Sequence, residues 1–212
     1  MLRVIFLIMG YCCGLLQTGY LYGRLHGIDI RNSGSGNSGA TNTLRVLGKK
    51  AGAIVFFGDF LKCLIPSLIV FFAFRNSQLE MAYIYMMYMV IGVILGHNYP
   101  FYLEFKGGKG IACTAGVVVA LDWRITLVCL TLFILTVAFT RYVSLGSLLV
   151  VTALFLMSVL FGETGLFYLG THKIEFYGLV FFVAALAFWR HRANISRLIK
   201  GTENKIGSKK KE

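Results

Sequence analysis

Charged side chains are scarce in this chain of 212 residues, since Asp, Glu, Lys and Arg together make up only 14% of it. Soluble globular domains carry about 25% charged residues. Apolar residues account for 57% of the chain, and the mean hydropathy is +0.73. This composition excludes an ordinary soluble domain and indicates an integral membrane protein.

Acidic residues and prolines are also few. Nine Asp and Glu oppose 21 Lys and Arg, which leaves a net charge of +12. In so apolar a chain this surplus indicates a basic face at a lipid membrane, and no nucleic-acid partner is expected. Because there are two Pro and no polar linker, we expect one transmembrane domain over residues 1–204 and a basic, disordered tail over residues 205–212.

Metal and redox motifs are missing. The five Cys include no CxxC pair, and no His stands at metal-ligand spacing. Buried free thiols are the simplest interpretation, so the protein is expected to need no metal ion and no cofactor.

Seven apolar runs are candidates for helices that cross the membrane. They are Leu2–Leu25, Ala51–Phe74, Leu79–Gly96, Ile111–Leu121, Ile125–Phe139, Val143–Phe161 and Phe176–Trp189. A crossing helix needs about 20 residues, and three of these runs are shorter. Residues 111–139 could instead form one long crossing that contains Asp122 and Arg124.

The distribution of Lys and Arg favours seven crossings. With the N-terminus outside, 9 + 8 = 17 of the 21 basic residues lie inside and four lie outside, as the positive-inside rule requires. Merging residues 111–139 leaves nine inside and eleven outside. We therefore predict an all-α integral membrane protein, a seven-transmembrane-helix bundle with a cytoplasmic C-terminus and an outer turn at residues 121–124.

The first polar segment on the inner side is rich in Gly, Ser and Asn. Its GxGxxG pattern does not indicate a dinucleotide site, because no strand precedes it. Glycines can instead let backbone amides converge on an anion, and an Arg follows. The alternative is a flexible connector between two helices. The candidate phosphate-binding residues are Gly34, Ser35, Gly36, Asn37, Gly39, Thr41, Asn42 and Arg45.

The second polar segment, residues 96–110, ends in a Gly-rich loop with two lysines. No Ser or Thr follows Lys109, so an ATP-binding P-loop is not supported. A plain positive-inside loop would explain the lysines but not the glycines around them. The candidate anion-binding residues are Lys106, Gly107, Gly108, Lys109 and Gly110.

Two further polar segments precede and follow the last apolar runs. Ser144 is a candidate helix N-cap or ligand donor. His191 and Asn194 share one face of a predicted helix. The basic residues of that helix, Arg190, Arg192, Arg197 and Lys200, are interpreted as lipid contacts.

Asp59 and Lys62 stand three residues apart inside the second apolar run. Ionisable groups are costly within a membrane, so we predict a structural ion pair between them that supports the inner loops.

Together these segments resemble the bacterial acyl-phosphate:glycerol-3-phosphate acyltransferase family. The resemblance rests on GSGNSGATNTLRVLGKK (34–50), DFLK (59–62), GHNYPFYLEFKGGKGIA (96–112), RYVSLGS (141–147) and HRANISRLIKGTE (191–203). It implies a seven-helix fold with its active site at the cytoplasmic side of the bacterial inner membrane.

The resemblance also implies an activity and a set of site residues. The expected reaction moves a fatty acyl group from acyl phosphate to the 1-hydroxyl of glycerol 3-phosphate and gives lysophosphatidate and phosphate. Catalytic roles would fall on Ser35, Arg45, Lys109, His191 and Asn194, with Ser144 completing the pocket and Glu203 in a structural role. Departures from the family pattern are Leu15, Gln17, Cys63 and Cys113.

No HxxxxD pair is present, so we expect the phosphate of the acyl donor to accept the hydroxyl proton while His191 orients the substrate. Backbone amides of residues 34–39 are the expected donors to the developing oxyanion. The chain is expected to be monomeric. The alternative interpretation is a transporter or channel for a phosphorylated organic anion, and a scaffold that only binds acidic lipid ranks last.

Overall fold

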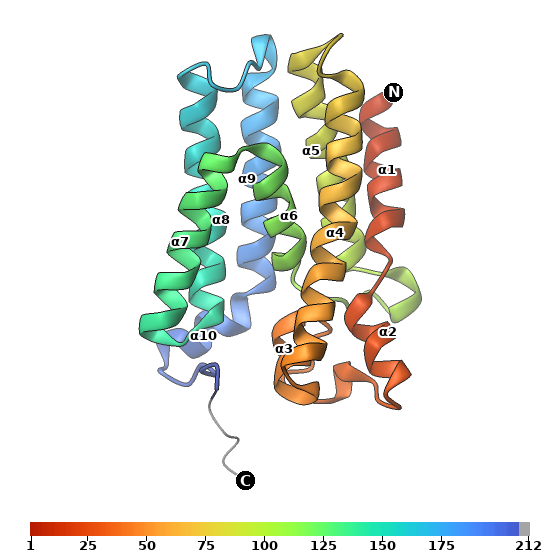
Figure 1. Ribbon diagram of the computed structural model, residues 1–212, viewed down its shortest axis with the longest axis vertical. Coiled ribbons are helices and arrows are strands. Elements are labelled where there is room, and N and C mark those ends of the chain that lie inside the picture. The colour runs from red at the N-terminus through yellow and green to blue at the C-terminus, as the bar shows by residue number, and fades with distance from the viewer. Residues whose placement is uncertain (208–212) are drawn as a thin grey trace.

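The computed structural model describes residues 1–207, and this part of the chain is helical with no strand. Figure 1 shows a bundle of long helices with the N-terminus at one end. The C-terminal segment lies at the other end, together with the short helices α2, α3 and α10. Those three helices span Thr18–Leu25, Ala40–Leu47 and Arg192–Ile199.

The long helices follow the apolar runs of the sequence. They are α1 (Leu2–Gly14), α4 (Lys49–Phe74), α5 (Leu79–Asn98), α6 (Ile111–Leu121), α7 (Trp123–Thr140), α8 (Val143–Glu163) and α9 (Lys173–Arg190). Single 3-10 turns lie at Ile30–Asn32, Phe101–Leu103 and Gly170–His172. Within residues 1–207, six helical segments are long and apolar enough to cross a membrane.

The fourth expected crossing is the short one. Helix α6 has 11 residues and is about 16 Å long, against a hydrocarbon layer of about 30 Å. The structure therefore confirms a helical membrane protein but does not confirm seven complete crossings. The count of seven and the orientation of the termini stay predictions.

Asp122 separates α6 from α7. Its carboxylate accepts a hydrogen bond from the backbone N–H of Arg124 at 2.7 Å and pairs with the guanidinium of Arg124 at 2.8 Å. This capping of α7 confirms two helices in place of one long crossing. In Figure 1 this turn lies well short of the ends of α8 and α9, so the ion pair lowers the cost of placing two charges there.

The first apolar run is not one continuous helix as expected. Helix α1 ends at Gly14 and α2 begins at Thr18. The buried amide of Gln17 lies 3.1 Å from the carbonyl oxygens of Gly14, Gly96 and His97. Nε2 of Gln17 thus donates hydrogen bonds to carbonyls at the ends of α1 and α5.

Helices α1 and α5 pack backbone to backbone. A Cβ atom on Gly10 or Gly14 would overlap a carbonyl oxygen of α5, and one on Gly92 or Gly96 would overlap a carbonyl oxygen of α1. The GxxxG spacing of Gly10 with Gly14 and of Gly92 with Gly96 allows this close approach. It places the end of α5, which carries His97, beside the break between α1 and α2.

The predicted tail begins later than residue 205. The backbone N–H of Ile206 donates to the carbonyl of Arg141 at 2.8 Å, and the Arg141 guanidinium donates to the carbonyl of Ile206. This attaches the C-terminal segment to the start of α8. The basic run Lys209–Lys211 lies outside the described residues.

Candidate active site

Two adjoining cavities lie at the end of the bundle that holds α2, α3 and α10. The inner cavity has a volume of about 140 Å³ and the outer one about 560 Å³. Ser35, Asn37 and Lys109 line both cavities. These three residues come from two segments far apart in the sequence and form the wall between the cavities.

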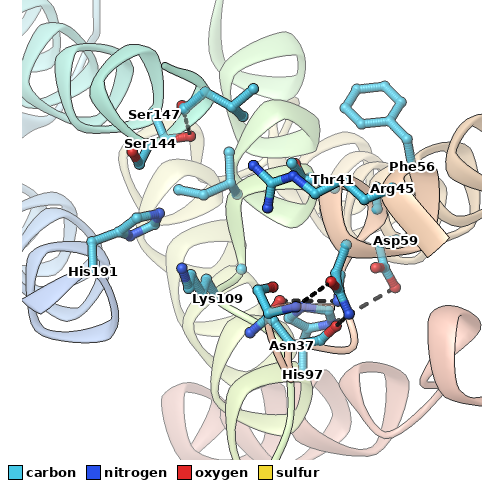
Figure 2. A pocket seen from close by; sticks show the side chains of 18 of the residues that line it. Asn37, Thr41, Arg45, Phe56, Asp59, His97, Lys109, Ser144, Ser147 and His191 are labelled. Atoms are coloured by element: carbon cyan, nitrogen blue, oxygen red, sulfur yellow. Dashed lines mark hydrogen bonds and ion pairs between the residues drawn. The ribbon is translucent and has the colours of Figure 1, made fainter. Parts of the chain in front are cut away.

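The inner cavity combines polar and apolar walls. Its apolar side includes Phe56, Ile111, Phe133 and Val143. Figure 2 shows its polar side chains, which come from several helices and from two loops. They are Asn37, Thr41, Arg45, Asp59, His97, Lys109, Ser144, Ser147 and His191.

The outer cavity is lined mainly by charged groups. Five of them are basic, namely Arg31, Lys106, Lys109, Arg190 and Arg197, and two are acidic, Asp29 and Glu104. Because basic groups outnumber acidic ones, this cavity favours anions. Arg31 pairs with Asp29 at 2.7 Å, which neutralises part of that charge.

Asn42 organises the Gly-rich loop at the edge of the inner cavity. Its Oδ1 accepts the backbone N–H of Ser35 at 2.7 Å. Its Nδ2 donates to the carbonyls of Ile30, Ser33 and Asn37 at 2.9–3.1 Å. A buried amide with these four contacts is a structural residue, because both of its N–H donors are used within the loop and none is left for a phosphate.

The expectation that the backbone amides of this loop converge on an anion is wrong for three of them. The N–H of Ser35 is taken by Asn42, that of Gly36 donates to the carbonyl of Ser33, and that of Gly39 donates to Oδ1 of Asn37. Gly34 and Gly36 have φ of 62° and 72°, a conformation that favours glycine. The glycines therefore serve the turn, and the side chains of Ser35 and Asn37 are what the loop presents to the cavities.

Arg45 lies in the last turn of α3. Its side chain lines the inner cavity beside Thr41, one helical turn earlier. Its Nη2 also donates to the carbonyl of Asn204 at 3.4 Å. Arg45 thus reaches the site from one side while Lys109 reaches it from another.

Lys109 is the cation at the junction of the two cavities. Its Nζ donates to Oδ1 of Asn194 on α10. Burial, opposed in part by the carboxylate of Glu203, lowers the pKa of Lys109 to about 8. The ammonium group is therefore charged at neutral pH and close to titrating.

Lys106 does not belong to this cluster. Its Nζ pairs with the Glu104 carboxylate at 2.7 Å, and 72% of its side chain is exposed. It lies at the rim of the outer cavity. The structure thus separates the two lysines, with Lys109 at the junction of the cavities and Lys106 at the rim.

Glu203 joins three side chains beneath Lys109. Its Oε1 accepts from the Ser144 hydroxyl at 3.0 Å and from Nδ2 of Asn194 at 2.7 Å, and its Oε2 pairs with Arg197 at 2.7 Å. Burial raises the pKa of Glu203, but the hydrogen bonds outweigh burial and the net pKa lies below the usual value. The resulting carboxylate fixes the amide of Asn194 with its oxygen toward Lys109.

His191 is neutral and presents one nitrogen to the inner cavity. Its Nδ1 lies 2.8 Å from the carbonyl of Ala187, so Nδ1 carries the proton and Nε2 is the acceptor. Burial lowers the pKa of His191 to about 4, with Lys109 adding to the shift. Figure 2 shows the ring directed toward the centre of the site.

A buried cluster closes the far side of the inner cavity. Nζ of Lys62 lies 2.7 Å from Asp59, 2.6 Å from the carbonyl of Leu16 and 2.9 Å from Nδ1 of His97. The Asp59–Lys62 ion pair is thus present as predicted. His97 was missed as its third member, because residues 35 positions apart leave no local pattern. Cys63 and Cys113, two departures from the family pattern, are buried free thiols.

The lipid interpretation fails for two residues of the C-terminal basic segment. Arg190 donates to the carbonyls of Gly107 and Gly108, and Arg197 pairs with Glu203. Arg192 is exposed over the ring of Trp189, with a guanidinium-to-centroid distance of 4.7 Å. For Arg192 and the exposed Lys200, lipid contact stays a prediction.

The chemistry of this arrangement is that of phosphate binding beside an apolar wall. Arg45 and Lys109 bring two cations to one small cavity, and hydroxyl and amide donors accompany them. Phe56 and Phe133 offer a surface for an apolar group. Such a site can hold an anionic headgroup at the end of a lipid tail.

Known proteins resemble this chain in sequence and in fold over nearly its whole length. The sequence model of the family described as glycerol-3-phosphate acyltransferase matches residues 4–201. The glycerol-3-phosphate acyltransferase of Clostridioides difficile (strain 630) is 42% identical, with 98% of this chain and 97% of the relative covered. That of Thermoanaerobacter sp. (strain X514) is 40% identical, with 99% and 98% covered.

Two crystal structures of PlsY (YgiH), an integral membrane glycerol 3-phosphate acyltransferase, have the same fold. The glycerol 3-phosphate form has a TM-score of 0.83 and 36% identity, and covers 97% of this chain and 96% of that one. The lysophosphatidic acid form has a TM-score of 0.81 and 35% identity, with 97% and 95% covered.

Proposed function

Because the chain belongs to the glycerol-3-phosphate acyltransferase family, we propose that acyl phosphate is its acyl donor. In this reaction the 1-hydroxyl of glycerol 3-phosphate attacks the carbonyl carbon of acyl phosphate. The bond from that carbon to the phosphate oxygen breaks, and the products are lysophosphatidate and inorganic phosphate. Solved relatives in a glycerol 3-phosphate form and a lysophosphatidic acid form support this acceptor and this product.

The observation that carries the proposal is the shared wall between the two cavities. Ser35, Asn37 and Lys109 face both of them. One cavity has an apolar side suited to an acyl chain, and the other has an excess of basic groups suited to a second phosphate. Two phosphorylated reactants can therefore approach one another at Lys109, which would make the reaction effectively unimolecular.

In this mechanism, cationic and polar side chains stabilise the negative charges that develop during acyl transfer. Arg45 and Lys109 neutralise the phosphate that leaves, which improves it as a leaving group. Since three loop amides are already paired within the loop, we assign the oxyanion contacts to Ser35 and to Nδ2 of Asn37. The loss of one such donor costs about 10²–10³-fold in rate.

The hydroxyl proton passes to the phosphate of the donor. Burial lowers the pKa of His191 to about 4, which makes its ring a weak base. The phosphate oxygen gains negative charge as the carbon–oxygen bond breaks and is thus the better acceptor for the proton. Nε2 of His191 then accepts a hydrogen bond from the glycerol hydroxyl and orients it for attack. The proton leaves with the inorganic phosphate, so charge and protons balance.

We place the active site on the cytoplasmic side of the bacterial inner membrane. The excess of Lys and Arg in the segments that build the site supports this orientation. The N-terminus and helix α10 lie at opposite ends of the bundle, which fits an outside N-terminus. We also propose that the monomer is the active unit, because one chain supplies the lining of both cavities.

The direct test is synthesis with purified components. Protein in detergent, mixed with acyl phosphate and glycerol 3-phosphate, should form lysophosphatidate and phosphate in equal amounts without coenzyme A or added metal. Lys109→Ala should lower this rate by about 10²–10³-fold. Lys106→Ala is the matched control and should stay near wild type, because Lys106 is exposed at the rim.

Two results would contradict the proposal. One is the absence of lysophosphatidate with active-site residues intact. The other is uptake of glycerol 3-phosphate into liposomes by the protein with no covalent product, which would favour the transporter interpretation.

A further inference from the structure

The backbone of Gly107 and Gly108 is held from two sides. The N–H of Gly107 donates to the carbonyl of Asn98 at 3.2 Å, and the N–H of Gly108 donates to the carbonyl of His97 at 3.1 Å. Both acceptors lie at the end of α5. On this side the two glycines use their N–H groups. Their carbonyl oxygens can therefore accept hydrogen bonds from another residue.

Arg190, the last residue of α9, is that partner. Its Nη2 donates to the carbonyl of Gly107 at 3.0 Å and to that of Gly108 at 2.7 Å, and its Nε donates to Gly108 at 3.1 Å. The guanidinium lies over the ring of Tyr99, 5.0 Å from the centroid. A planar fork can reach two carbonyls at once, which an ammonium group cannot do in the same geometry.

The glycines cannot be anchored by side chains of their own. A Cβ atom on Gly107 would overlap the carbonyl oxygen of His97, and one on Gly108 would overlap Nε2 of the His97 ring. The loop must therefore be glycine to fit against α5, and a glycine loop needs an outside contact to be rigid. Arg190 supplies that contact.

We propose that Arg190 is a positioning residue that fixes Lys109 at the junction of the two cavities. Lys109 directly follows the clamped dipeptide, and the same corner of the chain contacts Lys109 through Asn194. Arg190 and Asn194 thus tie two consecutive stretches of the loop to the α9–α10 corner. This inference rests on the proposed acyl transfer, since Lys109 is the phosphate-binding cation of that reaction.

The test compares Arg190→Ala, Arg190→Lys and the matched control Arg192→Ala. Arg192 lies two residues further along the chain and has the same charge, but its side chain is exposed over the ring of Trp189. Arg190→Ala should lower the rate of lysophosphatidate formation by about 10²-fold, the effect of misplacing a catalytic group by about 1 Å. Arg190→Lys should recover only part of the loss, and Arg192→Ala should stay within about twofold of wild type, because surface pairs contribute little.

Two readouts separate positioning from a general loss of structure. Guanidinium ions added to Arg190→Ala should restore part of the activity, whereas ammonium ions should not. In a Lys109→Ala background, Arg190→Ala should have less than about a threefold further effect, because a residue that acts through Lys109 has nothing left to position.

The results of this test distinguish a failure of the proposed function from a failure of the inference about Arg190. If the wild type makes no lysophosphatidate, the proposed function fails and this inference fails with it. If the wild type is active, Arg190 is shown not to position Lys109 by any of three results: near-normal activity of Arg190→Ala, equal loss in both Lys109 backgrounds, or a loss that guanidinium does not relieve. Should Arg190→Ala not fold, Arg190→Lys carries the same double-mutant comparison.

Discussion

The pH dependence of the reaction follows from the pKa of Lys109. Burial lowers this pKa to about 8, so about 90% of the free protein carries the charged ammonium at pH 7 and about 10% does at pH 9. The ratio kcat/KM reports the ionisation of the free enzyme. It should therefore fall about tenfold between pH 7 and pH 9. A lysine with an ordinary pKa of about 10.4 would lose almost nothing over this interval.

Initial rates of lysophosphatidate formation at low glycerol 3-phosphate, measured from pH 5.5 to 9.5 with a blank for spontaneous donor hydrolysis, give this profile. Lys109→Arg is the control, because arginine stays charged throughout the range and should remove the alkaline decline. The low-pH limb should follow the substrate phosphate near its pKa of about 6, above the pKa of His191 at about 4. A rate that stays constant to pH 9.5, or the same decline in Lys109→Arg, would refute the reasoning.

Two further substitutions test other parts of the site. Asp59→Ala leaves the buried charge of Lys62 without its carboxylate and should destabilise the protein by about 3–5 kcal/mol, seen as a lower melting temperature in detergent. Asp122→Ala removes a more exposed pair and the N-cap of α7 and should cost about 1–2 kcal/mol, so an equal shift would argue against a special role for the buried pair. His191→Ala should slow the reaction but leave activity well above that of Lys109→Ala. Complete loss with normal binding of both substrates would identify His191 as the base.

The long helices could be predicted from the sequence because their apolar runs are bounded by charged or glycine residues. The break at Asp122 was predictable for the same reason, since a carboxylate capping an N-terminus has a local pattern. The break after Gly14 was not, because the amide of Gln17 at this break donates to carbonyls of Gly96 and His97, which are about 80 positions away in the sequence. Hydropathy reports transfer to lipid and contains no information on such contacts.

The site was predictable at the level of segments and less so at the level of atoms. Lys109 and Asn194 do meet, as the resemblance implied. The contacts of Asn42 and Arg190 were not predicted, because both side chains bind backbone carbonyls. Backbone groups are the same for every residue, so no pattern of side chains in the sequence marks their partners.

The measurement that tests the central claim most directly is the initial-rate pattern with both substrates varied. If acyl phosphate and glycerol 3-phosphate occupy the two cavities together, double-reciprocal plots at several fixed concentrations of one substrate should intersect. Parallel lines would indicate that phosphate departs before glycerol 3-phosphate binds, through an acylated side chain, and would contradict direct transfer across Lys109.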